Sequence, residues 1–216
     1  LLPERFRLVS GPGCPVCVTA QRYIDAVIDL AGQSGVTIAS YGDMLRVPGR
    51  KGSLETQRAS GSVIKVVYSI RDAVKLARVH PDRQVVFVGV GFETTAPATA
   101  AGIMEARSLG LENFSVLPAH KLVVPAMMAL LDAGDVPIDG FLCPGHVSVI
   151  IGTDAYLPIV EQHGRPCVIA GFEPGQIMEG LGLLGDQISR GQSRIENCYR
   201  AAVEREGNPQ ARRIME

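Results

Sequence analysis

The sequence predicts an α/β fold made of two related, mostly parallel βα-repeat domains that face a cleft. Short apolar runs recur at intervals of 26 to 28 residues, first near residues 8, 36 and 63 and then near 85, 113, 139 and 167. Amphipathic helical patterns lie between them, and this alternation is typical of parallel sheets with right-handed crossovers. Gly91-Phe92-Glu93 and Gly171-Phe172-Glu173 each follow an apolar run and precede a helical pattern, which indicates that the two halves are related.

The composition excludes several classes of protein. The 216 residues are 46% hydrophobic, which is ample for a packed core. The net charge of -1 and the scattered basic residues argue against nucleic-acid binding. No apolar run approaches the roughly 18 residues of a membrane span, and we find no secretory signal. Five cysteines do not resemble a secreted disulfide framework, so we expect a cytoplasmic protein.

The first domain is predicted over residues 1–82 and lacks an element at its start. A strand over Phe6 to Val9 leads through a glycine-rich turn into a helix. The apolar face of that helix carries Ile24, Val27, Ile28 and Ala31. Further strands are predicted at 36–41 and 63–68, with a long loop between them that holds about one helical turn.

Ser69 and Asp72 then form a capping box, which predicts a helix that ends before Pro81. The second domain follows over residues 83–190. Its predicted strands lie at 85–90, 114–117, 141–142 and 167–170, and its predicted helices at 96–109, 123–133 and 154–163. The polar tail, residues 191–216, is expected to be a helical linker toward a missing C-terminal domain.

The stretch GPGCPVC (Gly11–Cys17) carries the most specific chemistry. Pro15 suits the first position of the following helix, so Cys14 is predicted at its N-cap and Cys17 one turn further on. The partial positive charge of a helix start favours a thiolate, which predicts a lowered pKa for Cys14. The two thiols can close a disulfide, bind a soft metal, or do both in turn. The alternative is a pair of buried small residues beside a turn.

Other polar clusters fall where predicted strands end, which is where open α/β sheets bind ligands. Glu93, Thr94 and Thr95 stand at the start of a predicted helix, where they either cap it or form a functional site. His120 and His146 are candidate proton carriers or metal ligands, although a lone histidine is more often simply hydrogen-bonded.

A zinc site is a further alternative. Cys14, Cys17, Cys143 and His146 together have the ligand types of a Cys3His site, but the pairs are 126 residues apart, unlike a zinc finger. Cys143 is equally well explained as a core thiol. Cys167, in an apolar strand, and Cys198, on a polar helix, are interpreted as structural.

Five motifs in this order resemble the HypD family of [NiFe]-hydrogenase maturation factors: GPGCPVC, GFETTAP, LPAHK, CPGHVSVIIG and AGFEP. The resemblance implies two related α/β domains and a third domain with a [4Fe-4S] cluster. It also implies a cytoplasmic protein that works with a HypC-type chaperone and a HypE-type cyanide donor. Together they assemble the Fe(CN)2CO centre, which is delivered to the hydrogenase large subunit.

By the same resemblance, Cys14 and Cys17 are the paired thiols that hold iron or perform disulfide redox chemistry, with electrons supplied by the cluster. Other motif positions are implied to line the cleft: Glu93, Thr94, Thr95, His120, Cys143 and His146. The family's MEVCGTHT motif is expected before the first residue, and the cluster cysteines after the last. The iron site of this chain would then lack one thiol, and the cluster ligands would be absent. Two alternatives stay open, a dithiol oxidoreductase and a zinc-stabilised interaction scaffold.

Overall fold

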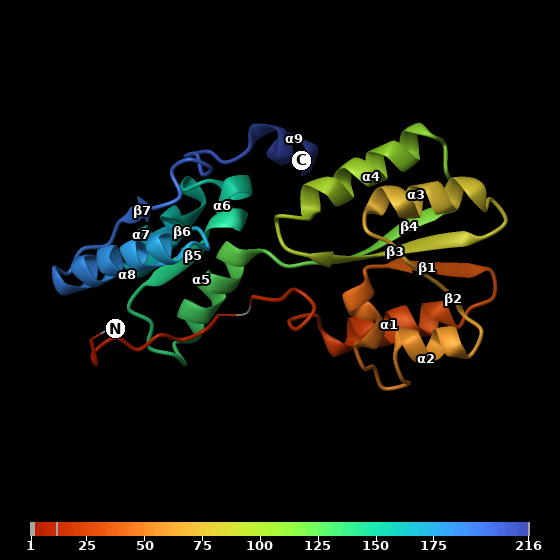
Figure 1. The fold of residues 1–216 in the computed structure, drawn as a ribbon, viewed down its shortest axis with the longest axis horizontal. Helices are drawn as coiled ribbons and strands as arrows, with labels where there is room; N and C mark the ends of the chain where they lie inside the picture. The colour runs from red at the N-terminus through yellow and green to blue at the C-terminus, as the bar shows by residue number, and fades with distance from the viewer. Residues whose placement is uncertain (1–2, 12, 216) are drawn as a thin grey trace. The chain divides into compact units, whose positions relative to one another are not determined.

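Two separate sheets organise the chain in a computed structural model that describes residues 3–11 and 13–215 (Figure 1). The residues divide into two units. Unit 1 comprises Leu1–Val90 and Ala106–Ala119, and unit 2 comprises Gly91–Glu105 and His120–Glu216. Both units combine strands with helices, and every registered pair of strands runs parallel. The predicted α/β class with mostly parallel sheets is therefore confirmed.

Unit 1 contains a four-stranded sheet with the order β2-β1-β3-β4. Its strands are β1 (Val36–Ser40), β2 (Val63–Val66), β3 (Gln84–Gly91) and β4 (Phe114–His120). Thr37 of β1 is in register with Val63 of β2 on one side and with Val85 of β3 on the other. The helices are α1 (Gln21–Ala31), α2 (Leu54–Ala59) and α3 (Ile70–Val79). The α4 helix (Ala96–Ser108) belongs to unit 2 as far as Glu105 and to unit 1 from Ala106.

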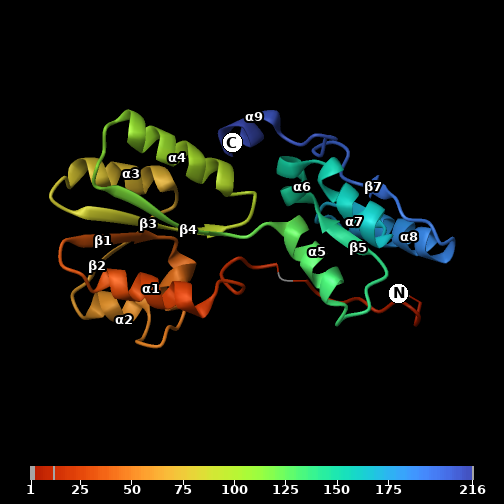
Figure 2. The same cartoon turned by 180° about the vertical axis from the view of Figure 1, so that it is seen from behind.

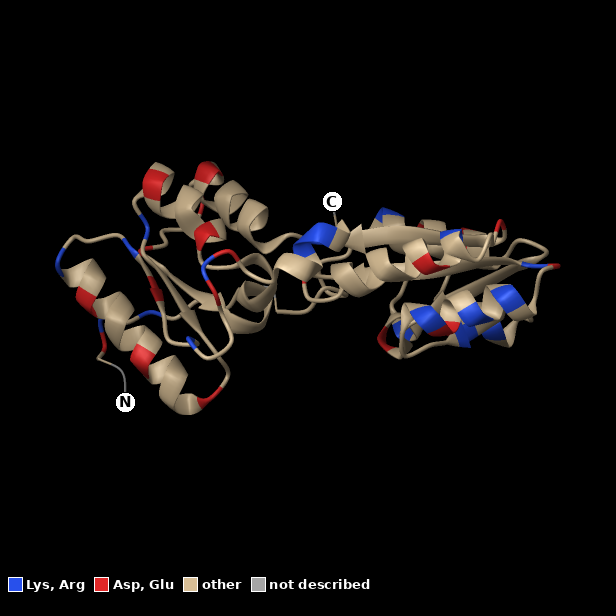
Figure 3. Ribbon diagram, turned by 90° about the horizontal axis from the view of Figure 1, so that it is seen from above, with Lys and Arg blue, Asp and Glu red and all other residues tan. Residues whose placement is uncertain are grey.

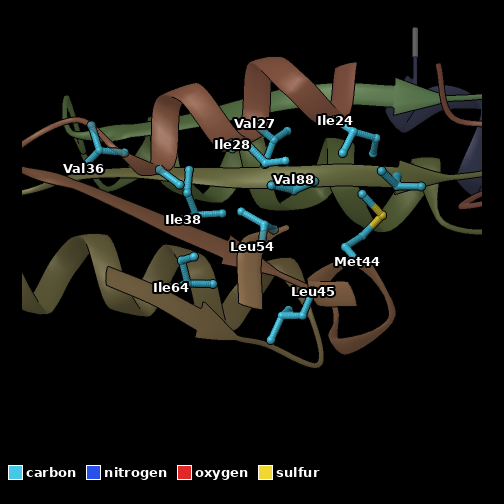
Figure 4. Packing of buried hydrophobic residues seen from close by; sticks show 12 residues of the cluster. Ile24, Val27, Ile28, Val36, Ile38, Met44, Leu45, Leu54, Ile64 and Val88 are labelled. Atoms are coloured by element: carbon cyan, nitrogen blue, oxygen red, sulfur yellow. The ribbon is translucent and has the colours of Figure 1, made fainter. Parts of the chain in front are cut away.

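Both faces of this sheet are covered, as the apolar strands predict. Ile38 and Val88 face a core built with α1 and α2 (Figure 4). Ala39 and Phe87, one residue along each strand, face the opposite core, which is built with α3. The views from front and back agree that α1 and α2 cover one face and α3 the other (Figure 2). The alternation follows from the two-residue period of a strand.

Unit 2 contains a three-stranded sheet, β5-β6-β7. The strands are β5 (Phe141–Pro144), β6 (Cys167–Ala170) and β7 (Ile195–Asn197). Its helices are α5 (Val123–Ala133), α6 (Gly145–Ile151), α7 (Leu157–His163), α8 (Pro174–Ser189) and α9 (Pro209–Met215). Tyr156 and Ile159 are fully buried and lie in one core cluster with the β5 and β6 side chains.

Several local expectations differ from the structure. Phe6 to Val9 does not form a strand, and Leu8 and Val9 are each 61% exposed, because no neighbouring strand pairs with this segment among the described residues. The loop over 42–61 contains more helix than expected, a 3-10 helix (Gly42–Arg46) as well as α2. The capping box at Ser69 and Asp72 is present at the start of α3.

The boundaries of the units also differ from the predicted division between residues 82 and 83. β3 and β4 follow that point, yet they pair within the first sheet, so residues up to Val90 and again from Ala106 to Ala119 belong to unit 1. The tail after residue 190 contains β7, which pairs with β6, and a helix only from Pro209 onward. The tail is thus part of the fold of unit 2.

Charged residues of both signs occur in each unit (Figure 3). Some form surface ion pairs, such as Lys51 Nζ with Asp29 Oδ1 at 2.8 Å. No helix within residues 3–11 and 13–215 has the length and apolar character needed to cross a membrane.

Candidate functional site

The Cys14–Cys17 segment is a turn ahead of α1 and not the first turn of that helix. The α1 helix begins at Gln21, so the expectation that Cys14 is its N-cap is wrong. The helix starts later than predicted because Thr19 closes a separate turn. Its Oγ1 donates to the Pro15 carbonyl at 2.8 Å and its N–H to the Val16 carbonyl at 3.1 Å. Val16 packs against the unit 1 core and anchors the turn. Pro12, within the predicted motif, lies outside the described residues.

The two sulfur atoms of this turn are chemically unequal. Hydrogen bonds from the Cys17 thiol and then from the Cys17 N–H, whose nitrogen lies 3.4 Å from Cys14 Sγ, lower the pKa of Cys14, although the charge of Asp43 opposes them. Donation to Cys14 and the negative charge there raise the pKa of Cys17. The direction for Cys14 agrees with the prediction, but its cause is the local turn. Cys14 is therefore the more readily ionised thiol of the pair, and the exposed Cys17 donates to it.

Glu93 is a buried carboxylate that caps a helix distant in sequence. Its side chain is 4% exposed, and Oε1 accepts a 2.7 Å hydrogen bond from the N–H of Val123, the first residue of α5. A negative charge is stabilised at a helix N-terminus. Capping was the alternative to a functional role, but it occurs on α5 and not on the helix that follows Glu93. The other oxygen, Oε2, is buried without a hydrogen-bond partner among the described residues.

The side chains of Thr95 and His120 both lie next to Gly91. Thr94, by contrast, is exposed. A Cβ atom at Gly91 would overlap Thr95 Oγ1 and lie 3.1 Å from His120 Cδ2, so only glycine fits there. Thr95 Oγ1 donates to the Phe92 carbonyl at 3.2 Å, a local turn contact. His120 is half-buried, and burial lowers the pKa of its ring.

Thr99 is a member of this cluster that the sequence analysis missed. Its Oγ1 lies 3.3 Å from His120 Nε2. The available signal was the spacing of Thr95 and Thr99, four residues apart at the start of the helix predicted over 96–109, which places both on one side. The contact with His120, 21 residues further along the chain, has no such local signal.

Cys143 and His146 lie in different surroundings despite their short spacing. Cys143 is buried in the unit 2 core, where burial and the neighbouring Cys167 thiol raise its pKa well above the ordinary value. Its thiol donates to the Phe141 carbonyl at 3.8 Å. His146 is exposed and its ring centroid lies 4.7 Å from that of Phe172. Cys143 faces inward from β5 and His146 stands on the next helix, so they do not form a ligand pair.

His146, Phe172 and Tyr199 follow the carboxyl ends of β5, β6 and β7 in turn. Tyr199 completes this aromatic group, with its ring centroid 6.2 Å from that of His146. The repeated Gly-Phe-Glu segment gave a signal for Phe172, and nothing in the sequence pointed to Tyr199. Among residues 3–11 and 13–215, no group of three or more His, Cys, Asp or Glu side chains is arranged to hold a metal ion.

Comparison with known proteins gives a consistent result. The HypD family model, described as "Hydrogenase formation hypA family", matches residues 1–216. The chain is 47% identical to the hydrogenase maturation factor HypD of Azotobacter vinelandii, over 99% of this chain and 58% of that protein. It is 44% identical to the HypD of Escherichia coli K12, over 96% of this chain and 56% of that protein.

An archaeal relative, a putative hydrogenase expression/formation protein of Methanocaldococcus jannaschii, is 43% identical over 100% of this chain and 60% of its own length. The chain therefore spans a little over half the length of the curated relatives it matches.

Proposed function

Because the chain belongs to the HypD family of hydrogenase formation proteins, we propose that the full-length protein is a hydrogenase maturation factor that carries iron while the Fe(CN)2CO centre is assembled. Iron is the cargo in this proposal, and the Cys14–Cys17 pair is its holder. The proposed setting is the cytoplasm, where reducing conditions keep thiols free. The proposed partners are a HypC-type chaperone, a HypE-type cyanide donor and, indirectly, the hydrogenase large subunit.

The observation that carries this proposal is the polarised Cys14–Cys17 turn. A thiolate is the soft ligand that low-valent iron prefers, and the Cys17 groups lower the pKa of Cys14. When Cys17 also loses its proton, both sulfurs can bind the metal. If the two sulfurs instead close a disulfide, one S–S bond forms, and two electrons and two protons pass to an acceptor such as a protein disulfide, which becomes a dithiol. The pair therefore has the chemistry both to hold iron and to deliver electrons.

The residues of unit 2 have supporting roles in this proposal. His120 is a neutral ring suited to accept a proton, because burial lowers its pKa. Glu93 accepts a hydrogen bond from the first residue of α5 and so fixes the start of that helix. Thr94 and Thr95 lie in the turn between β3 and α4. His146 is exposed and available to a partner or ligand, whereas the buried Cys143 thiol does not favour a role in metal binding.

The residues described here do not fit a [4Fe-4S] cluster. Such a cluster is usually held by four cysteine thiolates, whereas three of the five cysteines have other surroundings. Cys143 and Cys167 are core residues, and burial raises the pKa of Cys198. No step of the proposed function is assigned to a cluster on this chain.

The test is an infrared spectrum of the full-length protein, purified without oxygen together with its chaperone partner. We expect bands of iron-bound cyanide and carbon monoxide, and their loss in the Cys14→Ser/Cys17→Ser double variant with the fold intact. Cys198→Ser is the matched control, because it removes a thiol outside the turn, and it is expected to keep the bands. A double variant that keeps the bands, or an iron-replete wild-type complex without them, would refute the proposal.

The same asymmetry of the two thiols favours a dithiol oxidoreductase as the second candidate. A lowered pKa at Cys14 and a protonated partner at Cys17 are the features of an attacking and a resolving thiol. This function predicts reversible Cys14–Cys17 oxidation and turnover of a generic protein disulfide without bound iron. A zinc scaffold has no comparable support, since Cys143 is a core thiol.

A further inference from the structure

We propose that Thr99 is a positioning residue that holds His120 in the tautomer protonated on Nε2, which leaves Nδ1 as the proton acceptor of the ring. His120 is the last residue of β4 and Thr99 lies in the first turn of α4. Thr99 Oγ1 and His120 Nε2 are 3.3 Å apart. Thr99 is 6% exposed, so water competes little for its hydroxyl group.

Counting hydrogen bonds distinguishes the two tautomers. The Thr99 hydroxyl has one proton and two partners within reach, and the second is the Thr95 carbonyl at 3.1 Å. A carbonyl oxygen only accepts, whereas an imidazole nitrogen donates or accepts. If the hydroxyl donates to Thr95 and His120 Nε2–H donates to the hydroxyl, both bonds form. If an unprotonated Nε2 takes the hydroxyl proton, the bond to Thr95 is lost.

The Thr95 carbonyl can accept both of the hydrogen bonds that this arrangement gives it. The backbone N–H of Thr99 donates to it at 3.1 Å in the regular helical pattern. A carbonyl oxygen has two lone pairs, so the hydroxyl bond is added to this one and does not replace it. The arrangement therefore leaves none of these groups without a partner.

The packing of the ring supports the same assignment. A Cβ atom at Gly91 would lie 3.1 Å from His120 Cδ2, so the Cδ2 side of the ring is close to the chain at Gly91. Cδ2 and Nε2 are bonded neighbours in imidazole. The Cδ2–Nε2 edge of the ring thus faces Gly91 and Thr99. Nδ1 is not part of that edge. The half-buried side chain leaves part of the ring accessible.

The tautomer determines which ligands His120 can serve. Burial lowers the pKa of the ring, so it is neutral at neutral pH, and in this tautomer Nδ1 carries an unprotonated lone pair. The ligand class is one that presents an O–H, N–H or S–H group to this nitrogen. When that proton moves to Nδ1, the ring becomes an imidazolium ion and Nε2–H continues to donate to Thr99. The ligand is left with the corresponding negative charge.

The test is nitrogen NMR on the full-length protein with 15N-labelled histidine rings, because protonated and unprotonated ring nitrogens have well-separated shifts. His120→Gln assigns the signals. At about pH 8, above the ordinary histidine pKa of about 6.5, we expect a protonated Nε2 and an unprotonated Nδ1. Thr99→Val should move both shifts toward the average of the two tautomers, and Thr99→Ser should restore them.

Matched controls separate this role from a structural one. Thr94→Val removes an exposed hydroxyl from the neighbouring turn and should leave the His120 shifts unchanged. The signals of His80, His146 and His163 report whether each variant keeps its fold. A wild-type His120 protonated on Nδ1 would overturn the proposal by itself, as would unchanged shifts in a folded Thr99→Val. The tautomer is measured without iron or partners, so it is independent of the proposed function.

Discussion

The side chains of Cys14, Cys17 and Cys143 differ in chemistry because their surroundings differ. The first two lie on a surface turn, where the Cys17 thiol donates to the Cys14 sulfur. This hydrogen bond lowers the pKa of Cys14 and raises that of Cys17. Cys143 lies in a core beside Cys167, where burial keeps the thiol protonated. Reactive cysteines are found in accessible surroundings that stabilise the thiolate. Thiol chemistry in the described chain is therefore expected at the turn.

The first prediction concerns the source of the lowered Cys14 pKa. Cys17→Ala removes the side-chain donor and should raise the Cys14 pKa, because only the backbone N–H then stabilises the thiolate. Cys17→Ser is the matched control, since its hydroxyl can still donate. The rate of Cys14 alkylation by iodoacetamide, followed by mass spectrometry across pH, measures the pKa. A wild-type profile in the alanine variant would contradict the proposed cause.

The second prediction concerns Glu93. Glu93→Ala leaves the Val123 N–H without its 2.7 Å acceptor, and a buried unpaired donor costs about 1–3 kcal/mol. We expect a loss of unfolding free energy of about that size in urea denaturation. Glu93→Gln keeps an oxygen acceptor and removes the negative charge from a buried site. It should retain most of the stability, so equal losses in both variants would exclude capping as the role of Glu93.

At the scale of elements, the start of each helix depends on which side chains cap it. The α3 helix begins where the sequence predicts, because Asp72 Oδ2 accepts from the N–H of Ser69 at 3.2 Å and from that of Tyr68 at 3.3 Å. The α1 helix begins later than predicted, because Thr19 bonds the turn before it. Local hydrogen bonds therefore determine where both helices begin.

The third prediction is a pH dependence of the α3 cap. Burial opposes ionisation of Asp72, but hydrogen bonds from Tyr68 and Ser69 and the charge of Lys75 outweigh it and lower the Asp72 pKa. A carboxyl whose pKa is lower in the folded state stabilises it above the unfolded pKa of about 3.9. This stability is lost as the pH falls through the folded pKa.

Asp72→Asn should therefore be less stable than wild type above about pH 5, with the difference shrinking as the pH falls below the unfolded pKa of about 3.9. Thermal unfolding across pH measures it. Asp82→Asn, which removes an exposed carboxylate before β3, is the matched control and should show no such trend. A difference in Asp72→Asn that persists unchanged in acid would argue against the charged cap.

At the scale of the whole molecule, residues 204–208 tie the late part of unit 2 to the end of α6 and the segment after it. The backbone of residues 204–208 bonds to residues 150–154, including Asn208 N–H to the Ile150 carbonyl and Asp154 N–H to the Arg205 carbonyl, both at 3.1 Å. Gly207 has a φ of +73°, and a Cβ there would overlap the Ile150 carbonyl oxygen. The segment can approach this closely only without a side chain.

The fourth prediction tests this close approach. Gly207→Ala should destabilise unit 2 by clearly more than the roughly 1–2 kcal/mol expected for a left-handed backbone alone. Gly191→Ala isolates the backbone contribution, since Gly191 has a φ of +61° and open space around its Cβ position. Hydrogen exchange of the β6 and β7 amides measures both losses. Equal losses would show that the contact with Ile150 does not limit residue 207.

The sequence by itself determined the class of fold and the sites of its local chemistry. Six predicted strands correspond to β1–β6, because apolar runs between glycines and helical patterns are local features. The Cys14–Cys17 pair and the Ser69–Asp72 cap were also evident, since their members are three residues apart and contact each other directly.

Only the tertiary structure decided which elements share a sheet and which side chains meet. Placing β3 and β4 in the first sheet, and β7 beside β6, depends on strand pairing between distant segments. Glu93 reaches α5 across 30 residues, and Thr99 reaches His120 across 21. Cys143 and His146 are three residues apart, yet one faces the core and the other is exposed. Periodicity gives the positions of elements, but burial and long-range hydrogen bonds depend on how those elements pack.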